Sequence, residues 1–147
     1  MCTKKAQKKI TDVSVIVPVY NVEKYVARCL ESLVNQKCDC SYEIIIINDG
    51  TKDKSMDIVN DYAARYDFIH VYTQENSGVS VARNNGIAKA CGKYVMFVDS
   101  DDYVEPAMFE KMLDAMVQSD AEIAYCNFLL EYEFKPNESP YRNSGDI

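Results

Sequence analysis

Short apolar runs alternate with longer amphipathic segments along this chain. The runs are rich in β-branched residues, and they cover residues 13–19, 44–47, 69–72, 94–98 and 123–128. Near-continuous apolar strands are typical of parallel sheets that are covered on both faces. The pattern therefore predicts that each run is a parallel strand in the interior of one domain.

The segments between the first runs have the spacing of amphipathic helices. From Val22 to Val34, apolar residues recur at helical intervals, with Asn21 placed as the N-cap and Glu23 in the first turn. A second helix is predicted over residues 56–66, where the same spacing returns.

Two further helices are predicted nearer the C-terminus. One covers residues 79–90 and ends before Gly92, although Gly86 lies inside it. The other begins with Pro106 at its first position, which suits proline because the N–H of that residue has no partner within a helix. The residues that this helix is expected to bury are Phe109, Met112, Leu113, Met116 and Val117.

Strands that alternate with helices predict an α/β fold. Right-handed crossovers assemble such a chain into a Rossmann-like parallel sheet with helices on both faces. We expect a flexible basic tail at residues 1–11, the α/β domain at residues 12–130, and a loop at residues 131–147, where the periodicity is lost. The alternation ends without a following element, so the sequence predicts a truncated version of this architecture.

Composition narrows the classes of protein that fit. Of the 147 residues 48% are hydrophobic, enough for one buried core, and 16 basic against 23 acidic residues give a net charge of −7. That charge disfavours a broad interaction with nucleic acid. No apolar h-region follows the N-terminal lysines, and no apolar run approaches the roughly 20 residues of a transmembrane helix. We therefore expect a cytoplasmic protein without a signal peptide.

The cysteines fit a reduced protein. Three of them lie in apolar-periodic segments, where a small buried thiol is the ordinary interpretation: Cys29, Cys91 and Cys126. Cys38 and Cys40 are close in sequence, but with only His70 as a further nitrogen ligand they make no zinc set. We expect this pair in a loop.

Polar residues follow several of the predicted strands. In open α/β sheets ligands bind at the carboxyl ends of the strands. Residues 18–21, 48–51 and 99–102 occupy such positions, and in a parallel sheet these ends lie at one edge. The sequence therefore predicts a single site at that edge.

Asp99, Asp101 and Asp102 crowd together after the strand at residues 94–98, with Ser100 between the first two. Such carboxylates repel one another unless a cation offsets their charge. Two carboxylates leave most of an octahedral Mg²⁺ or Mn²⁺ shell free for water and phosphate oxygens. We therefore expect Asp99 and Asp101 to hold a metal on a diphosphate. The alternative is an acidic turn that caps the next helix, a role that suits Asp102.

The other two strand ends carry groups that can contact a nucleoside. The Asp49 carboxylate can accept the imide N–H of uracil or a sugar hydroxyl, although Asp49–Gly50 is also an ordinary turn sequence. Tyr20 can lay its ring against a base while Pro18 stiffens the strand exit, although an aromatic residue there is more often packing.

Residues 75–86 open a helix with small side chains, among them Asn76 and Gly78. Free N–H groups at a helix start favour an anion. Arg83 adds a positive charge that can neutralise a diphosphate or pair with a site aspartate. The alternative is a surface arginine on a solvated helix face.

Four stretches together, residues 13–21, 45–53, 75–86 and 97–102, resemble the family 2 inverting glycosyltransferases of GT-A fold. The resemblance implies transfer of a sugar from a nucleotide donor, most often a UDP-sugar, to an acceptor hydroxyl. In that family the counterparts of Tyr20 and Asp49 contact the base.

The resemblance also assigns roles at the acidic motif. It implies that Asp99 lies near the ribose and sugar and that Asp101 coordinates Mn²⁺ or Mg²⁺ on the diphosphate. Glu23 and Arg83 fall where family members commonly line the donor site, and we expect Asn21, Gly50, Asn76, Gly78 and Ser100 to belong to the same site. The chain has Asn48 where the family often has another aspartate.

An expected motif is missing. Family members carry a later Glu-Asp motif whose acid deprotonates the acceptor hydroxyl, and a later Gln-x-x-Arg-Trp motif. Neither follows Phe128, and Glu131, Glu133 and Glu138 lie in loop-like sequence. No catalytic residue is therefore identified, and the base is expected outside this chain.

Two other functions remain open at this stage. One is a nucleotide-sugar-binding module without transfer activity. The other is a nucleotidyltransferase, which is disfavoured because the first strand is not followed by a Gly-rich loop bearing a lysine. The resemblance implies cell-surface polysaccharide biosynthesis, and it leaves the sugar and the acceptor open, whether carbohydrate, lipid-linked sugar or protein.

Overall fold

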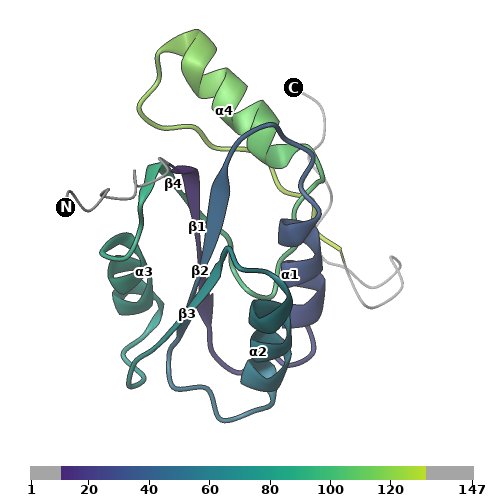
Figure 1. Cartoon of the computed structure of the whole chain (residues 1–147), viewed down its shortest axis with the longest axis vertical. Helices are drawn as coiled ribbons and strands as arrows, with labels where there is room; N and C mark the ends of the chain where they lie inside the picture. The colour runs from purple at the N-terminus through teal and green to yellow at the C-terminus, as the bar shows by residue number, and fades with distance from the viewer. Residues whose placement is uncertain (1–10, 132–147) are drawn as a thin grey trace, which may run out of the picture.

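The computed structural model describes residues 11–131 and shows an α/β chain in which strands and helices alternate (Figure 1). The predicted fold class is confirmed. The elements in chain order are β1 (Thr11–Val19), α1 (Val26–Val34), β2 (Tyr42–Asn48), α2 (Ser55–Arg65), β3 (Ile69–Thr73), α3 (Val79–Ile87), β4 (Gly92–Phe97) and α4 (Met108–Ser119).

The strands form one parallel sheet of four, in the order β3-β2-β1-β4. Helices α1 and α2 cover one face and α3 covers the other (Figure 1). Since β1 lies between β2 and β4, the carboxyl ends of these three strands are neighbours at one edge of the sheet. The predicted convergence of strand ends is therefore confirmed.

The core has two parts because alternate residues of a strand point to opposite faces. On the face of α1 and α2, Val15 and Val17 of β1 pack with Ile44 and Ile46 of β2. On the face of α3, a smaller cluster contains Ile16, Ile45, Ile47 and Ala82. Burial on both faces explains why these strands read as continuous apolar runs.

Gly86, which weakened the prediction of the third helix, has a packing role. A Cβ atom at this position would lie 2.4 Å from Cγ2 of Ile16. The helix α3 can approach β1 this closely only because residue 86 has no side chain. The glycine is therefore part of the interface between α3 and the sheet.

Two helices begin later than predicted. Residues 23–25 form a turn, α1 starts at Val26, and Asn21 adopts a left-handed conformation (φ 53°) without capping a helix. Helix α4 starts at Met108, two residues beyond Pro106, and Asp102 does not cap it. In both places the residues between the strand end and the helix form hydrogen bonds within a loop, so the helix begins further along the chain.

The predicted strand at residues 123–128 is wrong. These residues pair with no described strand, and Ile123 and Tyr125 are 83% and 91% exposed. A strand needs a neighbour to satisfy its backbone N–H and C=O groups, and an apolar run alone does not supply one. The predicted stripe of α4 is confirmed in part: Phe109 is fully buried, Met112, Leu113 and Met116 are half-buried, and Val117 is 68% exposed.

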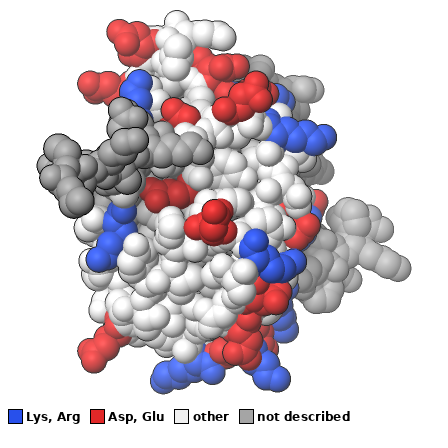
Figure 2. Space-filling view, viewed as in Figure 1, with Lys and Arg blue, Asp and Glu red and all other residues white. Residues whose placement is uncertain are grey.

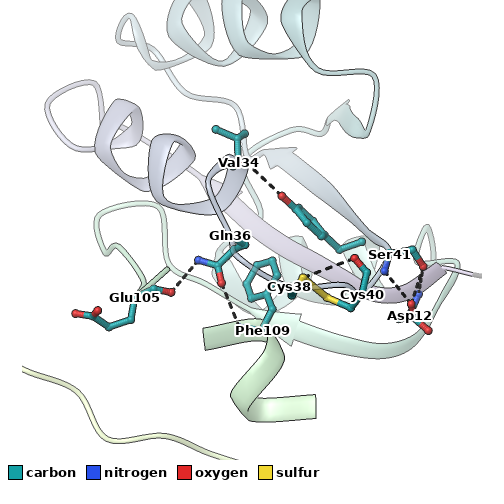
Figure 3. The surroundings of a disulfide bond; sticks show 9 residues. Asp12, Val34, Gln36, Cys38, Cys40, Ser41, Glu105 and Phe109 are labelled. Carbon is teal, nitrogen blue, oxygen red and sulfur yellow. Dashed lines mark hydrogen bonds between the residues drawn. A yellow bond between two sulfur atoms is a disulfide. The ribbon is translucent and has the colours of Figure 1, made fainter. Parts of the chain in front are cut away.

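The cysteines differ from the prediction of free, buried thiols. Cys38 and Cys40 are joined by a disulfide in the loop between α1 and β2 (Figure 3). Cys29 is buried as expected, whereas Cys91 and Cys126 are exposed, because they lie beyond α3 and α4 and not within them.

The disulfide loop is fastened to the start of α4. Gln36 donates from its amide to the carbonyl of Glu105 and accepts the N–H of Phe109 (Figure 3). The N–H of Lys37 donates to the carbonyl of Pro106 at 2.6 Å. Helix α4 therefore lies at the edge of the sheet where the strands begin, away from the edge with the predicted site (Figure 1).

Residues 1–10 and 132–147, which include most of the predicted basic tail, the C-terminal loop, Glu133 and Glu138, lie outside the described residues. Within residues 11–131 no helix is long and apolar enough to cross a membrane. On the face shown in Figure 2, acidic and basic side chains are interspersed.

Candidate functional site

A cavity of about 430 Å³ lies at the carboxyl ends of β1, β2 and β4. Most of the residues predicted for the site line it: Pro18, Tyr20, Asp49, Asn76, Gly78, Arg83, Asp99, Ser100 and Asp101. They come from segments up to 83 positions apart, and the parallel order of the sheet brings them together. Tyr20 is 44% exposed, so its ring is accessible from the cavity side.

Asn21 and Glu23, which were also predicted for the donor site, are not among the residues that line the cavity. The N–H of Asn21 donates to Thr51 Oγ1 at 2.8 Å, and the Glu23 carboxylate accepts the N–H of Lys54 at 3.0 Å. Both residues join the loop after β1 to the loop after β2. They hold the wall of the cavity in place.

Asp53 is the centre of this junction. Its carboxylate accepts hydrogen bonds from the hydroxyls of Thr51 and Ser55 and from the N–H groups of Ser55 and Glu23. Partial burial by itself raises the pKa of Asp53, but these hydrogen bonds bring the pKa down to about 2. The carboxylate is therefore held in its charged form between the two loops.

Asp49 is 3% exposed and anchors the segment that leads into α3. Its Oδ1 accepts from Gln74 Nε2 and from the N–H of Ser77, both at 2.8 Å. Its Oδ2 accepts from the N–H of Gly78 at 2.9 Å. A carboxylate has about four acceptor positions, so one remains for a ligand in the cavity.

Gly50 does not line the cavity but permits the turn beside Asp49. Its φ of +69° is in the left-handed region, and a Cβ atom would lie 3.0 Å from the backbone nitrogen of Asn76. A side chain would therefore push apart the two segments that present Asp49 and Asn76.

Arg83 is the one cation among the described residues that line the cavity. Its Nη2 lies 2.5 Å from Oδ1 of Asp99, with the two side chains 35% and 47% exposed. Its Nε is buried and has no hydrogen-bond partner among the described residues. The predicted pairing with a site aspartate is present, and the guanidinium keeps a donor for another acceptor.

Asp101 is exposed at the cavity, and no hydrogen bond or ion pair joins its side chain to another described residue. Burial, with the charges of Asp101 and Asp99, raises the pKa of neighbouring Asp102. Burial, with the charges of the same three aspartates, raises the pKa of the Cys29 thiol beneath them to about 12. The motif is a centre of negative charge in which only Asp99 has a cationic partner, Arg83.

These residues fit a divalent cation that is shared with a ligand. Among the described residues no group of three or more acidic, histidine or cysteine side chains is arranged to enclose a metal. One or two carboxylates with phosphate oxygens are the set that Mg²⁺ uses when it is bound together with a nucleotide. Asp101, with the oxygen of Asp99 that faces away from Arg83, can supply that set.

Some residues of the site were missed by sequence reasoning. Val19, Val22 and Val79 also line the cavity, and Gln74 and Ser77 orient Asp49. The strand-end rule could have found Gln74, because it directly follows β3. Val19 and Val79 lie in the predicted segments 18–21 and 75–86, but no valine was chosen as a site residue because an apolar side chain there reads as part of a strand or a helix.

Comparisons with known proteins show the family to which the chain belongs. The family model for glycosyl transferase family 2 matches residues 14–144. An uncharacterized glycosyltransferase of Bacillus subtilis (strain 168), EpsJ, is 47% identical over 79% of this chain and 33% of its own length. YibD of Escherichia coli (strain K12), also an uncharacterized glycosyltransferase, is 46% identical over 78% of this chain. The chain spans about a third of the length of these curated relatives.

Two solved structures share the fold. S. aureus TarS 1–349 in complex with UDP-GlcNAc matches with a TM-score of 0.67 and 33% identity, over 74% of this chain and 32% of that chain. The mannosyltransferase PcManGT from Pyrobaculum calidifontis, in complex with GDP-Man and Mn²⁺, has a TM-score of 0.65 at 21% identity, over 77% of this chain and 36% of its own. The chain belongs to glycosyl transferase family 2 and has the GT-A fold of that family.

Proposed function

We propose that this chain is the donor- and metal-binding part of a glycosyltransferase that transfers a sugar from a UDP-sugar to an acceptor hydroxyl with inversion. The cavity at the strand ends carries the proposal, because an exposed aromatic ring, a buried carboxylate, an arginine and a free carboxylate line it together. These groups match the base, the diphosphate and the metal of a nucleotide-sugar.

The base lies between Tyr20 and Asp49 in this proposal. The exposed ring of Tyr20 offers a stacking surface, and the remaining acceptor position of Asp49 takes the imide N–H of uracil. Pro18, Asn76 and Gly78 shape the walls of the same cavity.

The diphosphate lies between Arg83 and the acidic motif. Arg83 is one cation beside three carboxylates, too little to hold a diphosphate by charge alone. When bound at Asp101 and Asp99, Mn²⁺ or Mg²⁺ supplies positive charge that stabilises the departing diphosphate. Arg83 and the backbone around Ser100 then orient the leaving group.

The proposal gives this chain the leaving-group side of the reaction. The acceptor hydroxyl attacks the anomeric carbon as the bond to the diphosphate breaks, and its proton goes to a base that we assign to a part of the enzyme outside residues 11–131. A nucleotide-sugar-binding module without transfer activity in isolation is the alternative, and the absence of an assigned base within those residues favours it for this chain alone.

The setting of the reaction is proposed from the relatives. GgaB of Bacillus subtilis, described as a minor teichoic acid biosynthesis protein, is 41% identical over 76% of this chain. We place the enzyme in the cytoplasm, where nucleotide-sugars are made, in the biosynthesis of a cell-surface polysaccharide.

Calorimetry with Asp101→Ala tests the proposal. We expect the unchanged chain to bind UDP in the presence of Mn²⁺, and Asp101→Ala to lose at least about tenfold in affinity, since a charge-assisted contact contributes roughly 1.5–3 kcal/mol. Exposed Asp67→Ala serves as the matched control. Equal affinity of both variants for UDP would refute the metal assignment.

A second measurement separates transfer from binding. The chain is incubated with Mn²⁺, a panel of UDP-sugars and saccharide acceptors. Sustained product formation would exclude the binding-only alternative for this chain, whereas UDP binding without product would support it.

A further inference from the structure

Gln74 connects the candidate site to the outer side of α3. It directly follows β3, and its side chain lies between Asp49 and Asn85. Its Nε2 donates to Oδ1 of Asp49 at 2.8 Å, and its Oε1 accepts from Nδ2 of Asn85 at 2.6 Å. Its backbone N–H donates to the carbonyl of Asn48, and this bond fixes the position of the Gln74 backbone.

The donors and acceptors available determine the direction of the two hydrogen bonds made by the Gln74 side chain. Both oxygens of Asp49 accept from N–H donors, so the amide nitrogen of Gln74 and not its oxygen must face them. The amide oxygen of Gln74 then faces Asn85, which must donate. The chain Asn85 to Gln74 to Asp49 therefore holds the Gln74 amide in one of its two orientations.

Gln74 is half-buried and borders open space on one side. A second cavity, of about 370 Å³, lies beside it and is lined by Gln74 and Asn85 together with Tyr72 and Lys89. Since the amide borders this space, its hydrogen bonds decide where it points. Removal of either bond frees the side chain to turn into the cavity.

Gln74 is also the one side chain among the described residues that donates to Asp49. The other two donors are the backbone N–H groups of Ser77 and Gly78. Gln74 and Ser77 both bond Oδ1, and with Gly78 on Oδ2 they determine which acceptor position of Asp49 remains open. Gln74 is the one of these three donors that a side-chain substitution removes, and without it a second acceptor position of Asp49 is open and the carboxylate is held by two hydrogen bonds in place of three.

We propose that Gln74 is a positioning residue that sets the nucleobase selectivity of the site by orienting the Asp49 carboxylate. This inference rests on the proposed function, in which Asp49 meets the base. Uracil presents an N–H donor at its N3 position, whereas cytosine presents an acceptor there. A fixed carboxylate therefore binds uracil and repels cytosine, and a carboxylate that can turn discriminates less.

The test compares the affinities of variants for UDP and CDP, both measured calorimetrically with Mn²⁺. For Gln74→Leu we expect the ratio of UDP to CDP affinity to fall about tenfold, since the lost bond is to a charged group. Gln74→Glu keeps the shape but places a second carboxylate against Asp49, and we expect the ratio to fall further. Asn85→Ala removes the bond that orients Gln74 and should lower the ratio in the same direction.

The control is Gln118→Leu, at an exposed position of α4, which should leave both affinities unchanged. Amide hydrogen exchange at Ser77 and Gly78 in Gln74→Leu should accelerate, because the Asp49 oxygens that they bond become less fixed.

Equal losses of UDP and CDP affinity, with an unchanged ratio, would overturn the role of Gln74 and leave the proposed function intact. Failure of the unchanged chain to bind UDP would overturn both. Asn85→Ala, on an exposed side chain, keeps the test available if the Gln74 variants do not fold.

Discussion

Asp53 shows how a single carboxylate can organise a binding site that it does not line. Four hydrogen bonds from two loops converge on it, and they hold its pKa at about 2, below the ordinary value of 3.8 for an aspartate. A carboxyl group with a lowered pKa in the folded state stabilises that state above its unfolded pKa, and loses the contribution as the pH falls through the folded pKa.

We therefore predict that Asp53→Asn lowers the free energy of unfolding by about 1 kcal/mol near neutral pH, a value that allows for solvent screening of a partly exposed group. The difference between the two proteins should shrink as the pH falls from about 4 to about 2. Urea unfolding at a series of pH values measures it, with exposed Asp67→Asn as the control. A difference that stays constant down to pH 2 would contradict the role of Asp53.

Single residues also show what position after a strand does and does not decide. Asp49, Asp99 and Asp101 were predicted because each lies close behind an apolar strand, and the structure brings all three to one cavity. Asn21 and Glu23 follow a strand as well, but their side chains face the neighbouring loop. Position after a strand places a residue at the correct edge, and only the loop conformation decides which way its side chain points.

Among the elements, α3 depends most on a close contact. In a helix, alanine is more favourable than glycine by about 1 kcal/mol. At position 86, however, the Cβ of an alanine would lie 2.4 Å from Cγ2 of buried Ile16. Overpacking of a core costs about 1–3 kcal/mol, so the steric effect outweighs the propensity. Helix propensity alone would predict that Gly86→Ala raises the free energy of unfolding.

We predict that Gly86→Ala lowers the free energy of unfolding by about 1–2 kcal/mol. It should also weaken UDP binding, because α3 carries Arg83 into the cavity. Asn84→Ala, at an exposed position of the same helix, is the matched control and should stabilise slightly. Denaturant unfolding gives both values, and a stabilised Gly86→Ala would show that the helix can move away from β1.

Elements differ in how well their sequences specify them. The strands β1 and β2 are buried on both faces, and their apolar runs predicted them within two residues at each end. The run at residues 123–128 is equally apolar yet forms no strand, because strand formation depends on a partner that local sequence does not describe.

At the scale of the whole molecule, the cavity concentrates negative charge that a metal and a diphosphate would neutralise together. A ligand that binds only the folded state stabilises it in proportion to its saturation. With Mn²⁺ and UDP at about 100 times the dissociation constant, we expect the free energy of unfolding to rise by about 2.7 kcal/mol.

Thermal unfolding measures this stabilisation. EDTA should abolish the stabilisation. In EDTA, the protein with UDP should unfold at the same temperature as the protein without ligand. Mn²⁺ with uridine in place of UDP is the control, because the nucleoside lacks the phosphate oxygens that complete the metal shell. Stabilisation by UDP that persists in EDTA would show that Arg83 and the backbone suffice without a metal.

Local patterns of residues specify the α/β class, the parallel strands and the edge that carries the candidate site, because burial on two faces and polar strand ends are visible in the sequence. Three features follow only from packing: Asp99 pairs with Arg83, Gln74 bonds Asp49, and Gly86 lets the helix α3 approach the sheet. These are contacts between segments distant along the chain. Their geometry depends on how the elements pack, which no local pattern of residues encodes.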